Sequence, residues 1–254
     1  MQKLIRYTVV VPLKNEEENI QDLIEELKPI MQGLNEPWEL ICIDDGSSDN
    51  TLNILKALSV IHSELRTIVF DKNYGQSSAF DAGFKSAQGE FIITMDGDRQ
   101  NDPADIPKLV AAASDVDLVC GSRVNRRDPW VKKITSKIAN AVRSRVCHDS
   151  IQDTGCSLKV YRASAAKKVK MFNGMHRFLP ALFLMEGFHI KEIPVNHRER
   201  VKGKTKYNFF NRSFNTISDM LAVRWMHQRH LRYQIKSDTF NRPQVNAAIT
   251  KSSN

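Results

Sequence analysis

The chain has 254 residues, 41% of them hydrophobic and 26% charged, which is enough for one sizeable core and a C-terminal extension. No segment approaches the roughly 20 consecutive apolar residues of a membrane-spanning helix, so we expect no such helix. The first residues lead directly into a predicted strand, so we expect no signal peptide. Four widely spaced cysteines lack zinc-ligand or C-x-x-C spacing and fit thiols in a reducing cytosol: Cys42, Cys120, Cys147 and Cys156.

The net charge of +8 is divided unevenly along the chain. Residues 1–120 hold 10 Lys and Arg against 21 Asp and Glu, whereas residues 121–254 hold 27 against 8. The acidic half can hold a metal ion, and the basic half favours an anionic partner. Candidate partners are a nucleic acid, a phosphorylated acceptor and the anionic face of a membrane.

Strands and helices alternate over the first 120 residues. The hydrophobic patterns predict strands at 7–12, 38–44, 65–71, 90–95 and 116–121. Between them they predict a helix that opens at 15–18, a helix at 49–61 capped by Asp49, and helices at 76–87 and 103–113. This alternation predicts an α/β fold with a mostly parallel central sheet and helices on both faces.

The second half is less regular. We expect strands at 157–161 and 189–195, a basic amphipathic helix at 130–146 and a helix at 178–187. A further amphipathic helix is predicted from apolar residues spaced at four- and three-residue steps: Phe210, Phe214, Ile217, Leu221 and Trp225. This helix could dock on the core or lie at a membrane interface, and its basic flanks favour the interface.

Two acidic motifs end predicted strands. In Asp96-Gly97-Asp98, two carboxylates point toward the crevice where open α/β sheets bind ligands. Their mutual repulsion favours a divalent cation that bridges a diphosphate, although a solvated acidic turn would have the same residues. In Asp44-Asp45-Gly46, the carboxylates could accept hydrogen bonds from a ribose or a base, or form only a turn and a helix cap.

Two common nucleotide-binding motifs are missing from the sequence. Neither G-x-G-x-x-G nor a P-loop occurs, which argues against a dehydrogenase or an NTPase. A nucleotide would therefore have to be held by acids, a metal ion and basic side chains.

Four segments, in this order, resemble motifs of the family 2 inverting glycosyltransferases, which have the GT-A fold. They are residues 11–16 (VPLKNE), 44–49 (DDGSSD), 73–76 (NYGQ) with Ala79 and Gly83, and 95–103 (MDGDRQNDP). The combination and its order are highly specific. The resemblance implies a GT-A (Rossmann-like) catalytic domain over residues 1–207. The apolar spacing predicts the membrane- or core-docking helix within 208–235, and the polar, aperiodic composition of residues 236–254 predicts a disordered tail.

Two later segments narrow the resemblance to the polyprenyl-phosphate branch of that family. Residues 153–162 (DTGCSLKVYR) and the basic loop at 197–207 (HRERVKGKTKY) are similar to segments of dolichyl-phosphate mannose synthases, bactoprenol glucosyltransferases and undecaprenyl-phosphate aminoarabinose transferases. Thr205 stands where the branch usually has Ser. Many members continue into transmembrane helices, which we do not expect here. The catalytic domain then divides into a nucleotide and metal half, 1–121, and an acceptor half, 122–207.

The resemblance and the residue chemistry together imply four sets of site residues. Mg²⁺ or Mn²⁺ is held by Asp96, Asp98 and Gln100. The nucleotide sugar is bound by Pro12, Asn15, Glu16, Asp44, Asp45, Gly75, Gln76 and Asp96. The catalytic residues are Asp98, Asp153, Arg198 and Arg200. The acceptor phosphate is bound by Arg123, Arg126, Arg127, Arg198, Arg200, Lys204, Thr205, Lys206 and Tyr207.

Two of these assignments leave alternatives open. Asp153 could act as a general base or orient the acceptor, and we favour orientation because a phosphate acceptor is already anionic near neutral pH. Taken alone, the pair Arg126-Arg127 is typical of a solvated loop, whereas the density of cations at 198–207 favours a functional role.

The resemblance implies a metal-dependent transferase that moves a sugar, with inversion, from a UDP- or GDP-sugar to a polyprenyl phosphate. We expect a cytoplasmic protein at the inner face of the membrane, with a membrane-spanning partner as one possibility. Three alternatives differ in class: transfer to a carbohydrate or protein hydroxyl, which would require a true base; nucleic-acid binding by the basic half; and an inactive scaffold. The basic loop argues against a hydroxyl acceptor, and the acidic first half argues against nucleic-acid binding. The intact acidic motifs argue against an inactive scaffold.

Overall fold

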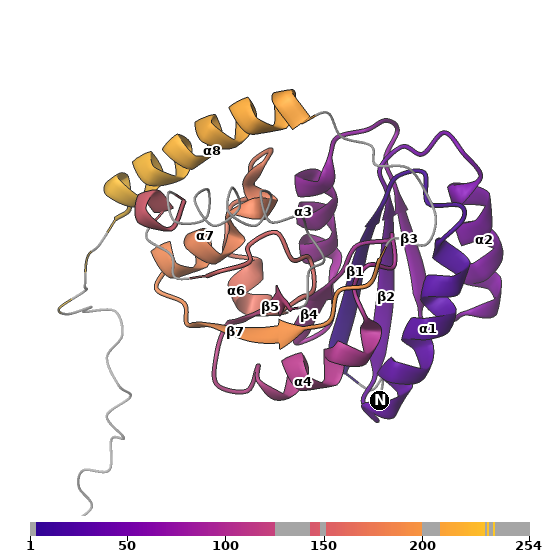
Figure 1. Ribbon diagram of the computed structural model, residues 1–254. Coiled ribbons are helices and arrows are strands. Elements are labelled where there is room, and N and C mark those ends of the chain that lie inside the picture. The colour runs from indigo at the N-terminus through magenta and orange to yellow at the C-terminus, as the bar shows by residue number, and fades with distance from the viewer. Residues whose placement is uncertain are drawn as a thin grey trace, which may run out of the picture.

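The computed structural model describes residues 4–124, 143–147, 151–199 and 209–231, together with Tyr233 and Lys236, and gives the backbone alone at 209–215. Its centre is one sheet with the strand order β3-β2-β1-β4-β6-β5-β7 (Figure 1). β6 pairs antiparallel with β4 and β5, and every other neighbouring pair is parallel. The predicted mostly parallel sheet is therefore confirmed.

The strands are β1 (Tyr7–Leu13), β2 (Trp38–Asp44), β3 (Leu65–Val69), β4 (Phe91–Thr94), β5 (Leu118–Arg123), β6 (Lys159–Arg162) and β7 (Ile190–Val195). The α-helices are α1 (Ile20–Gly33), α2 (Thr51–Ile61), α3 (Gln76–Ser86), α4 (Ile106–Ala111), α6 (Ala163–Ala166), α7 (Leu179–Met185) and α8 (Phe209–Arg229). Two short 3₁₀ turns are η1 (Pro103–Asp105) and η2 (Met175–Arg177). Residues 143–147 are also helical.

Helices cover both faces of the sheet, as predicted. Apolar side chains of α1, α2 and α4 form one core cluster with the strands, and those of α3, α6 and α7 form a second on the opposite face. β1 contributes to both, because Val9 and Val11 point into the first cluster and Val10 into the second. A central parallel strand is buried on both faces and therefore reads as a continuous apolar run. The four cysteines are buried, and none of them forms a disulfide bond.

Some helices and strands begin or end at other residues than predicted, because polar side chains form hydrogen bonds with the backbone groups there. The helix expected to open at 15–18 begins at Ile20. The backbone N–H groups of Asn15, Glu16 and Glu17 donate instead to side chains near the end of β2 and the start of α2. The second helix has Asn50 at its cap rather than Asp49, although the Asp49 carboxylate accepts a hydrogen bond of 3.0 Å from the Thr51 N–H.

The expected helix at 103–113 is divided. Asp102 accepts a hydrogen bond from the Ala104 N–H, which stabilises the 3₁₀ turn η1 before α4. The strand predicted at 157–161 starts later, at Lys159, because Ser157 hydrogen-bonds to Asn101 and, through its carbonyl, to Thr94. The short elements α6 and η2 were not predicted. Most of the predicted helix at 130–146, and the tail at 236–254 except Lys236, lie outside the described residues.

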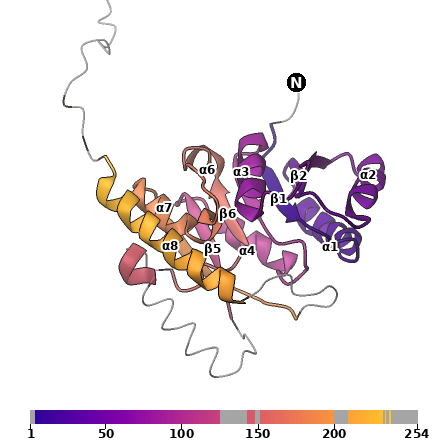
Figure 2. The same ribbon diagram turned by 90° about the horizontal axis from the view of Figure 1, so that it is seen from above.

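A helix, α8, lies where the C-terminal helix is predicted, but its packing differs from a simple docked stripe. Val223 is buried, and Met220 and Met226 pack against the second core cluster. By contrast, Leu221 and Trp225 of the predicted stripe are exposed. Seen from above, α8 crosses over the α7 side of the sheet, away from α1 and α2 (Figure 2). None of the helices in the described ranges is long and apolar enough to cross a bilayer.

The loop after β2 requires a glycine at position 46. Gly46 has a φ of 65°, and a Cβ there would lie 2.5 Å from the backbone carbon of Lys72. We expect Gly46→Ala to lower the free energy of unfolding by about 2 kcal/mol, because it adds backbone strain to a clash with a neighbouring loop. Urea unfolding followed by circular dichroism would measure this change.

Gly33→Ala is the matched control, because nothing lies within 4 Å of a Cβ at the end of α1. Equal unfolding midpoints for the two variants would contradict the requirement for glycine at position 46.

Candidate active site

The loops that follow β1, β2 and β3 are fastened to one another at the carboxyl edge of the sheet. The Asn15 N–H donates to Ser47 Oγ at 2.9 Å, and the Ser48 N–H donates to Asn15 Oδ1 at 2.8 Å. The ammonium of Lys14 donates to the carbonyl of Gly46. Asp45, after β2, accepts hydrogen bonds from the loop that follows β3. Because parallel strands end at the same edge, these hydrogen bonds together form a continuous rim. Pro12, Asn15 and Glu16, predicted to bind the nucleotide, lie in or beside this rim.

Asp44 and Asp45 lie buried at the same edge and bind backbone groups. The carboxylate of Asp45 accepts hydrogen bonds from the N–H groups of Tyr74, at 2.7 Å, and Gly75, at 2.9 Å. Asp44 accepts one from the Ser47 N–H at 3.1 Å. These carboxylates therefore shape the two loops in which the predicted nucleotide-binding residues lie. Their contact with a nucleotide stays a prediction.

Asp96 is the second residue after β4, and its side chain meets α3. Gln76 Nε2 donates to Asp96 Oδ1 at 2.9 Å, so two residues predicted for the nucleotide site are in contact. Burial raises the pKa of Asp96 above its ordinary value, and the negative charge of Asp98 raises it further. The positive charges of Lys159 and Arg123 oppose this rise. The edge thus combines a crowded pair of carboxylates with nearby cations.

The donor set of Asp96 and Asp98 fits a hard divalent cation. Within the described ranges, no group of three or more His, Cys, Asp and Glu residues could hold a metal ion. Mg²⁺ sites often use only one or two carboxylates, with waters and substrate phosphates completing the coordination. A cation here would offset both causes of the raised pKa of Asp96. Gln100 contributes its backbone carbonyl to Arg198, and its role as a ligand stays a prediction.

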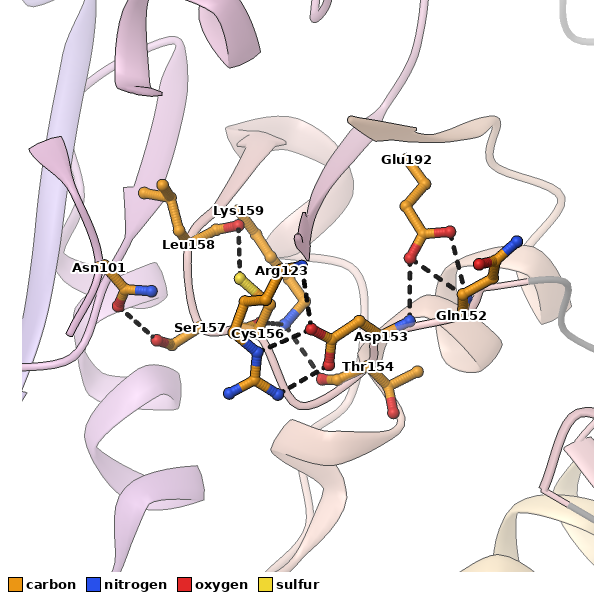
Figure 3. A network of polar contacts seen from close by, with 10 residues as sticks. All are labelled: Asn101, Arg123, Gln152, Asp153, Thr154, Cys156, Ser157, Leu158, Lys159 and Glu192. Atoms are coloured by element: carbon orange, nitrogen blue, oxygen red, sulfur yellow. Dashed lines mark hydrogen bonds and ion pairs between the residues drawn. The ribbon is translucent and has the colours of Figure 1, made fainter. Parts of the chain in front are cut away.

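Arg123 and Asp153 form a two-pronged ion pair (Figure 3). Arg123 Nε and Nη2 donate to the two carboxylate oxygens at 2.7 and 2.8 Å, and the Arg123 N–H adds a third hydrogen bond at 3.1 Å. Glu192 of β7 accepts a hydrogen bond from the Asp153 N–H at 2.9 Å. Because both oxygens of Asp153 engage Arg123, the geometry favours an orienting role over that of a general base.

Lys159 is a buried cation in the same network, with only 3% of its surface exposed. Its ammonium donates to the backbone carbonyls of Thr154, at 3.3 Å, and Cys156 (Figure 3). Ser157 Oγ donates to Asn101 Oδ1 at 2.7 Å, and Asn101 Oδ1 also accepts from the Asp96 N–H at 3.0 Å. These hydrogen bonds join the segment at 153–159 to the loop of Asp96 and Asp98.

Arg198, near the start of the basic loop at 197–207, connects this loop to residues of the acidic first half of the chain. Its guanidinium donates to Glu26 Oε2 at 2.6 Å and to Asp102 Oδ1 at 2.7 Å. Arg99, which has a φ of 61°, donates to Asp22 and to Glu26 from the other side. Glu26 is therefore shared by two arginines, and Arg198 acts here as a fastener of the loop. Its contact with an acceptor phosphate stays a prediction.

The other predicted residues of the basic segments lie outside the described residues: Arg126, Arg127, Arg200, Lys204, Thr205, Lys206 and Tyr207.

Sequence reasoning did not identify Glu26, Lys159 or Glu192. A single lysine among apolar residues of a predicted strand was a signal for Lys159. Glu26 gave no signal, because its partner Arg198 is 172 residues away in the sequence.

Glu26 gives the network a dependence on pH. Partial burial alone would raise its pKa, but hydrogen bonds from Arg99 and Arg198 lower the pKa below the ordinary value of 4.5. We expect Glu26→Gln to lower the free energy of unfolding by about 1 kcal/mol near pH 7. The difference from the wild type should shrink as the pH falls below 4.5 and through the lowered pKa, because Glu26 then becomes protonated and neutral.

Urea unfolding at several pH values would measure this difference. Glu25→Gln is the matched control, since Glu25 lies next to it and contacts only Gln21 among the hydrogen bonds described. A difference that stays constant down to pH 3 would contradict the assignment.

The family model described as glycosyl transferase family 2 matches residues 8–170. The dodecaprenyl-phosphate galacturonate synthase of Rhizobium johnstonii is 39% identical over 242 residues, covering 93% of this chain and 70% of that protein. The undecaprenyl-phosphate 4-deoxy-4-formamido-L-arabinose transferase of Proteus mirabilis is 37% identical over 223 residues, covering 87% of this chain and 68% of that protein.

Among solved structures, the glucosyl-3-phosphoglycerate synthase of Mycobacterium tuberculosis, in complex with Mn²⁺, uridine diphosphate and phosphoglyceric acid, has a similar fold. The TM-score is 0.65 at 18% identity, over 87% of this chain and 78% of that one. The likeness confirms the predicted GT-A fold. The match to the family model over residues 8–170 and the two relatives at 39% and 37% identity show that the chain belongs to glycosyl transferase family 2.

Proposed function

We propose that this protein transfers a sugar from a UDP-sugar to a polyprenyl phosphate, with inversion at the anomeric carbon. The observation that carries the proposal is that Asp96, crowded by Asp98, lies close enough to Arg123 and Lys159 at one edge of the sheet to feel their positive charges. The two carboxylates suit a cation that binds a diphosphate, and the two cationic side chains suit an anionic acceptor. Both relatives named above, at 37% and 39% identity, are named for transfer to a polyprenyl phosphate.

The donor would lie against the rim formed by the loops after β1, β2 and β3. Gln76 holds Asp96 in place through its hydrogen bond, and Asp45 fixes the loop that precedes α3. Asp96 and Asp98 would hold Mg²⁺ or Mn²⁺. When bound, the cation would neutralise negative charge on the diphosphate leaving group. The uridine nucleotide is proposed because the M. tuberculosis protein of the same fold was crystallised with uridine diphosphate.

The acceptor needs no strong base. A phosphate monoester has a second pKa of about 6, so near pH 7 an oxygen of the acceptor phosphate already carries the attacking electron pair. This oxygen bonds to the anomeric carbon while the bond from that carbon to the diphosphate breaks, and UDP leaves with the electrons. Arg123, held by Asp153, and the nearby Lys159 would offset the negative charges that meet in this step.

The reaction is tested by incubating the purified protein with undecaprenyl phosphate and a panel of labelled donors. The panel contains UDP-galacturonate, UDP-4-deoxy-4-formamido-arabinose, UDP-glucose and GDP-mannose. We expect label in the lipid extract from one UDP-sugar, dependent on Mg²⁺ or Mn²⁺ and lost with EDTA. Label from the GDP-sugar alone would overturn the uridine assignment, and label from none would overturn the proposed reaction.

Asp98→Asn should lower the rate of transfer by about 100-fold or more, because it removes one of the two carboxylates that would hold the cation. Asp81→Asn is the matched control, since Asp81 pairs with Lys85 on the exposed side of α3. The rate is measured at saturating donor with each variant. Equal rates for the two variants would contradict the metal-binding role of Asp98.

Asp153→Asn distinguishes orientation from base catalysis. If Asp153 orients Arg123, the variant should raise the KM for polyprenyl phosphate more than it lowers kcat, because an amide can accept only part of the two-pronged hydrogen bonding. Steady-state kinetics with varied acceptor would separate the two constants. A fall in kcat of about 100-fold or more at unchanged KM would instead make Asp153 a general base.

We also propose that the protein works at the inner, cytoplasmic face of the membrane, where a lipid acceptor and soluble nucleotide sugars meet.

A further inference from the structure

α8 is held to the rest of the protein by one face. Val223 is 1% exposed, and Met220 and Met226 pack against the second core cluster. Arg177 Nη1 donates to Thr216 Oγ1 at 2.8 Å, which fixes the first half of the helix. These contacts determine which side of α8 points away from the protein.

A second contact fixes the only acidic residue of the helix. A Cβ at Gly174 would lie 2.2 Å from Asp219 Oδ2, so the helix approaches η2 closely at this point. Burial raises the pKa of Asp219 above its ordinary value, consistent with a carboxyl group on the inward side. The sequence of α8 contains no other Asp or Glu. The outward side therefore carries no negative charge from the helix.

Three apolar side chains stand in line on that outward side. Ile217, Leu221 and Trp225 are 55%, 56% and 62% exposed. Residues four apart lie one above the other on a helix, so the three form a continuous apolar ridge. Isolated exposed apolar residues are ordinary, but an aligned set on a helix marks an interaction surface.

Positive charge flanks this ridge. Arg224 and Arg229 are both exposed. Arg224 lies to one side of the line through Ile217, Leu221 and Trp225, whereas Arg229, four residues after Trp225, continues that line at its C-terminal end. An apolar ridge with aromatic and aliphatic side chains, bordered by arginines and lacking acids, matches a helix that lies in the boundary between lipid head groups and acyl chains. The arginines would contact anionic head groups.

The position of α8 agrees with a lipid surface as its partner. In Figure 1, α8 lies at the end of the molecule toward which β1 and β2 run, and Figure 2 looks onto the same end and finds α8 in front of α7. The carboxyl edge that carries Asp96 faces this end. A bilayer against the ridge would therefore lie on the side from which a lipid phosphate would reach the candidate site.

We propose that the outward face of α8, formed by Ile217, Leu221 and Trp225 with Arg224 and Arg229, binds an anionic bilayer surface and presents the site to its lipid acceptor. The binding surface is a property of the helix itself. The purpose of the binding, delivery of polyprenyl phosphate, rests on the proposed function.

Vesicle flotation tests the surface without requiring activity. The full-length protein is mixed with phosphatidylcholine vesicles that contain or lack phosphatidylglycerol. We expect the wild type to float with the anionic vesicles. Leu221→Ser with Trp225→Ser should lower binding about 30-fold, because two large apolar side chains no longer enter the lipid. Arg224→Gln with Arg229→Gln should lower binding to anionic vesicles about 10-fold.

The matched control is Val60→Ser with Ile61→Ser, which removes two apolar residues at the end of α2 that are more exposed than Leu221 and Trp225. This variant should float like the wild type. Thermal unfolding should be unchanged in all three variants, since every substituted side chain is exposed. Wild-type binding by the Leu221 and Trp225 variant would overturn the proposal. So would a wild-type protein that stays off vesicles but forms dimers that this variant loses, because the ridge would then bind a second copy.

Transfer assays separate this proposal from the proposed function. With a short-chain, water-soluble prenyl phosphate, the Leu221 and Trp225 variant should keep the wild-type rate, whereas with undecaprenyl phosphate in vesicles its rate should fall about 10-fold or more. If the wild type transfers no sugar to either acceptor but floats with anionic vesicles, the proposed function fails and the surface stands. If transfer occurs and the variant floats like the wild type, the surface fails and the function stands.

Discussion

The burial of charged side chains at the carboxyl edge of the sheet is the constraint on which the surrounding loops depend. A buried carboxylate is costly unless hydrogen bonds or opposite charges compensate it. Asp45 is compensated by the backbone N–H groups of the loop before α3, and Asp153 by the guanidinium of Arg123. Asp96 has the amide of Gln76 but retains a raised pKa beside Asp98. Most of the buried carboxylates at this edge are therefore compensated. Asp96 and Asp98 are not fully compensated, and this is where the cation and the diphosphate are proposed to bind.

The same requirement joins the acidic and basic halves of the chain. Glu26 of α1 accepts hydrogen bonds from Arg99, beside the Asp96–Asp98 motif, and from Arg198, which follows β7. His197 and Asn101 form an isolated β-bridge at the same place. The loop that carries the carboxylate pair is therefore fastened both to α1 and to the start of the basic segment. This connection would hold a donor site in the first half of the chain and an acceptor site in the second half in a fixed relative position.

The sequence predicted the two acidic motifs because their position depends on a local rule. A carboxylate after the last residue of a parallel strand must lie at the carboxyl edge of the sheet, so Asp44, Asp45, Asp96 and Asp98 could be placed together. Their partners could not. Whether Asp45 would bind a nucleotide or its own neighbouring loop, and whether Arg198 would meet a phosphate or Glu26, depends on contacts between residues that are far apart in the chain. Lys159 could have been identified from the sequence, because a charged residue in a buried strand requires compensation.

The sequence by itself determined the α/β alternation, the mostly parallel sheet, the family resemblance and the existence of α8, because these follow from local periodicity and from motifs in order. It also determined that Ile217, Leu221 and Trp225 share one face of a helix. Only the tertiary structure decided which face of α8 docks, because helical spacing aligns side chains but does not orient them. Val223, Met220 and Met226 bury more effectively against the second core cluster, and their packing turns the ridge outward. The apolar stripe of α8, which could have packed in the core, therefore lies on the surface of the protein.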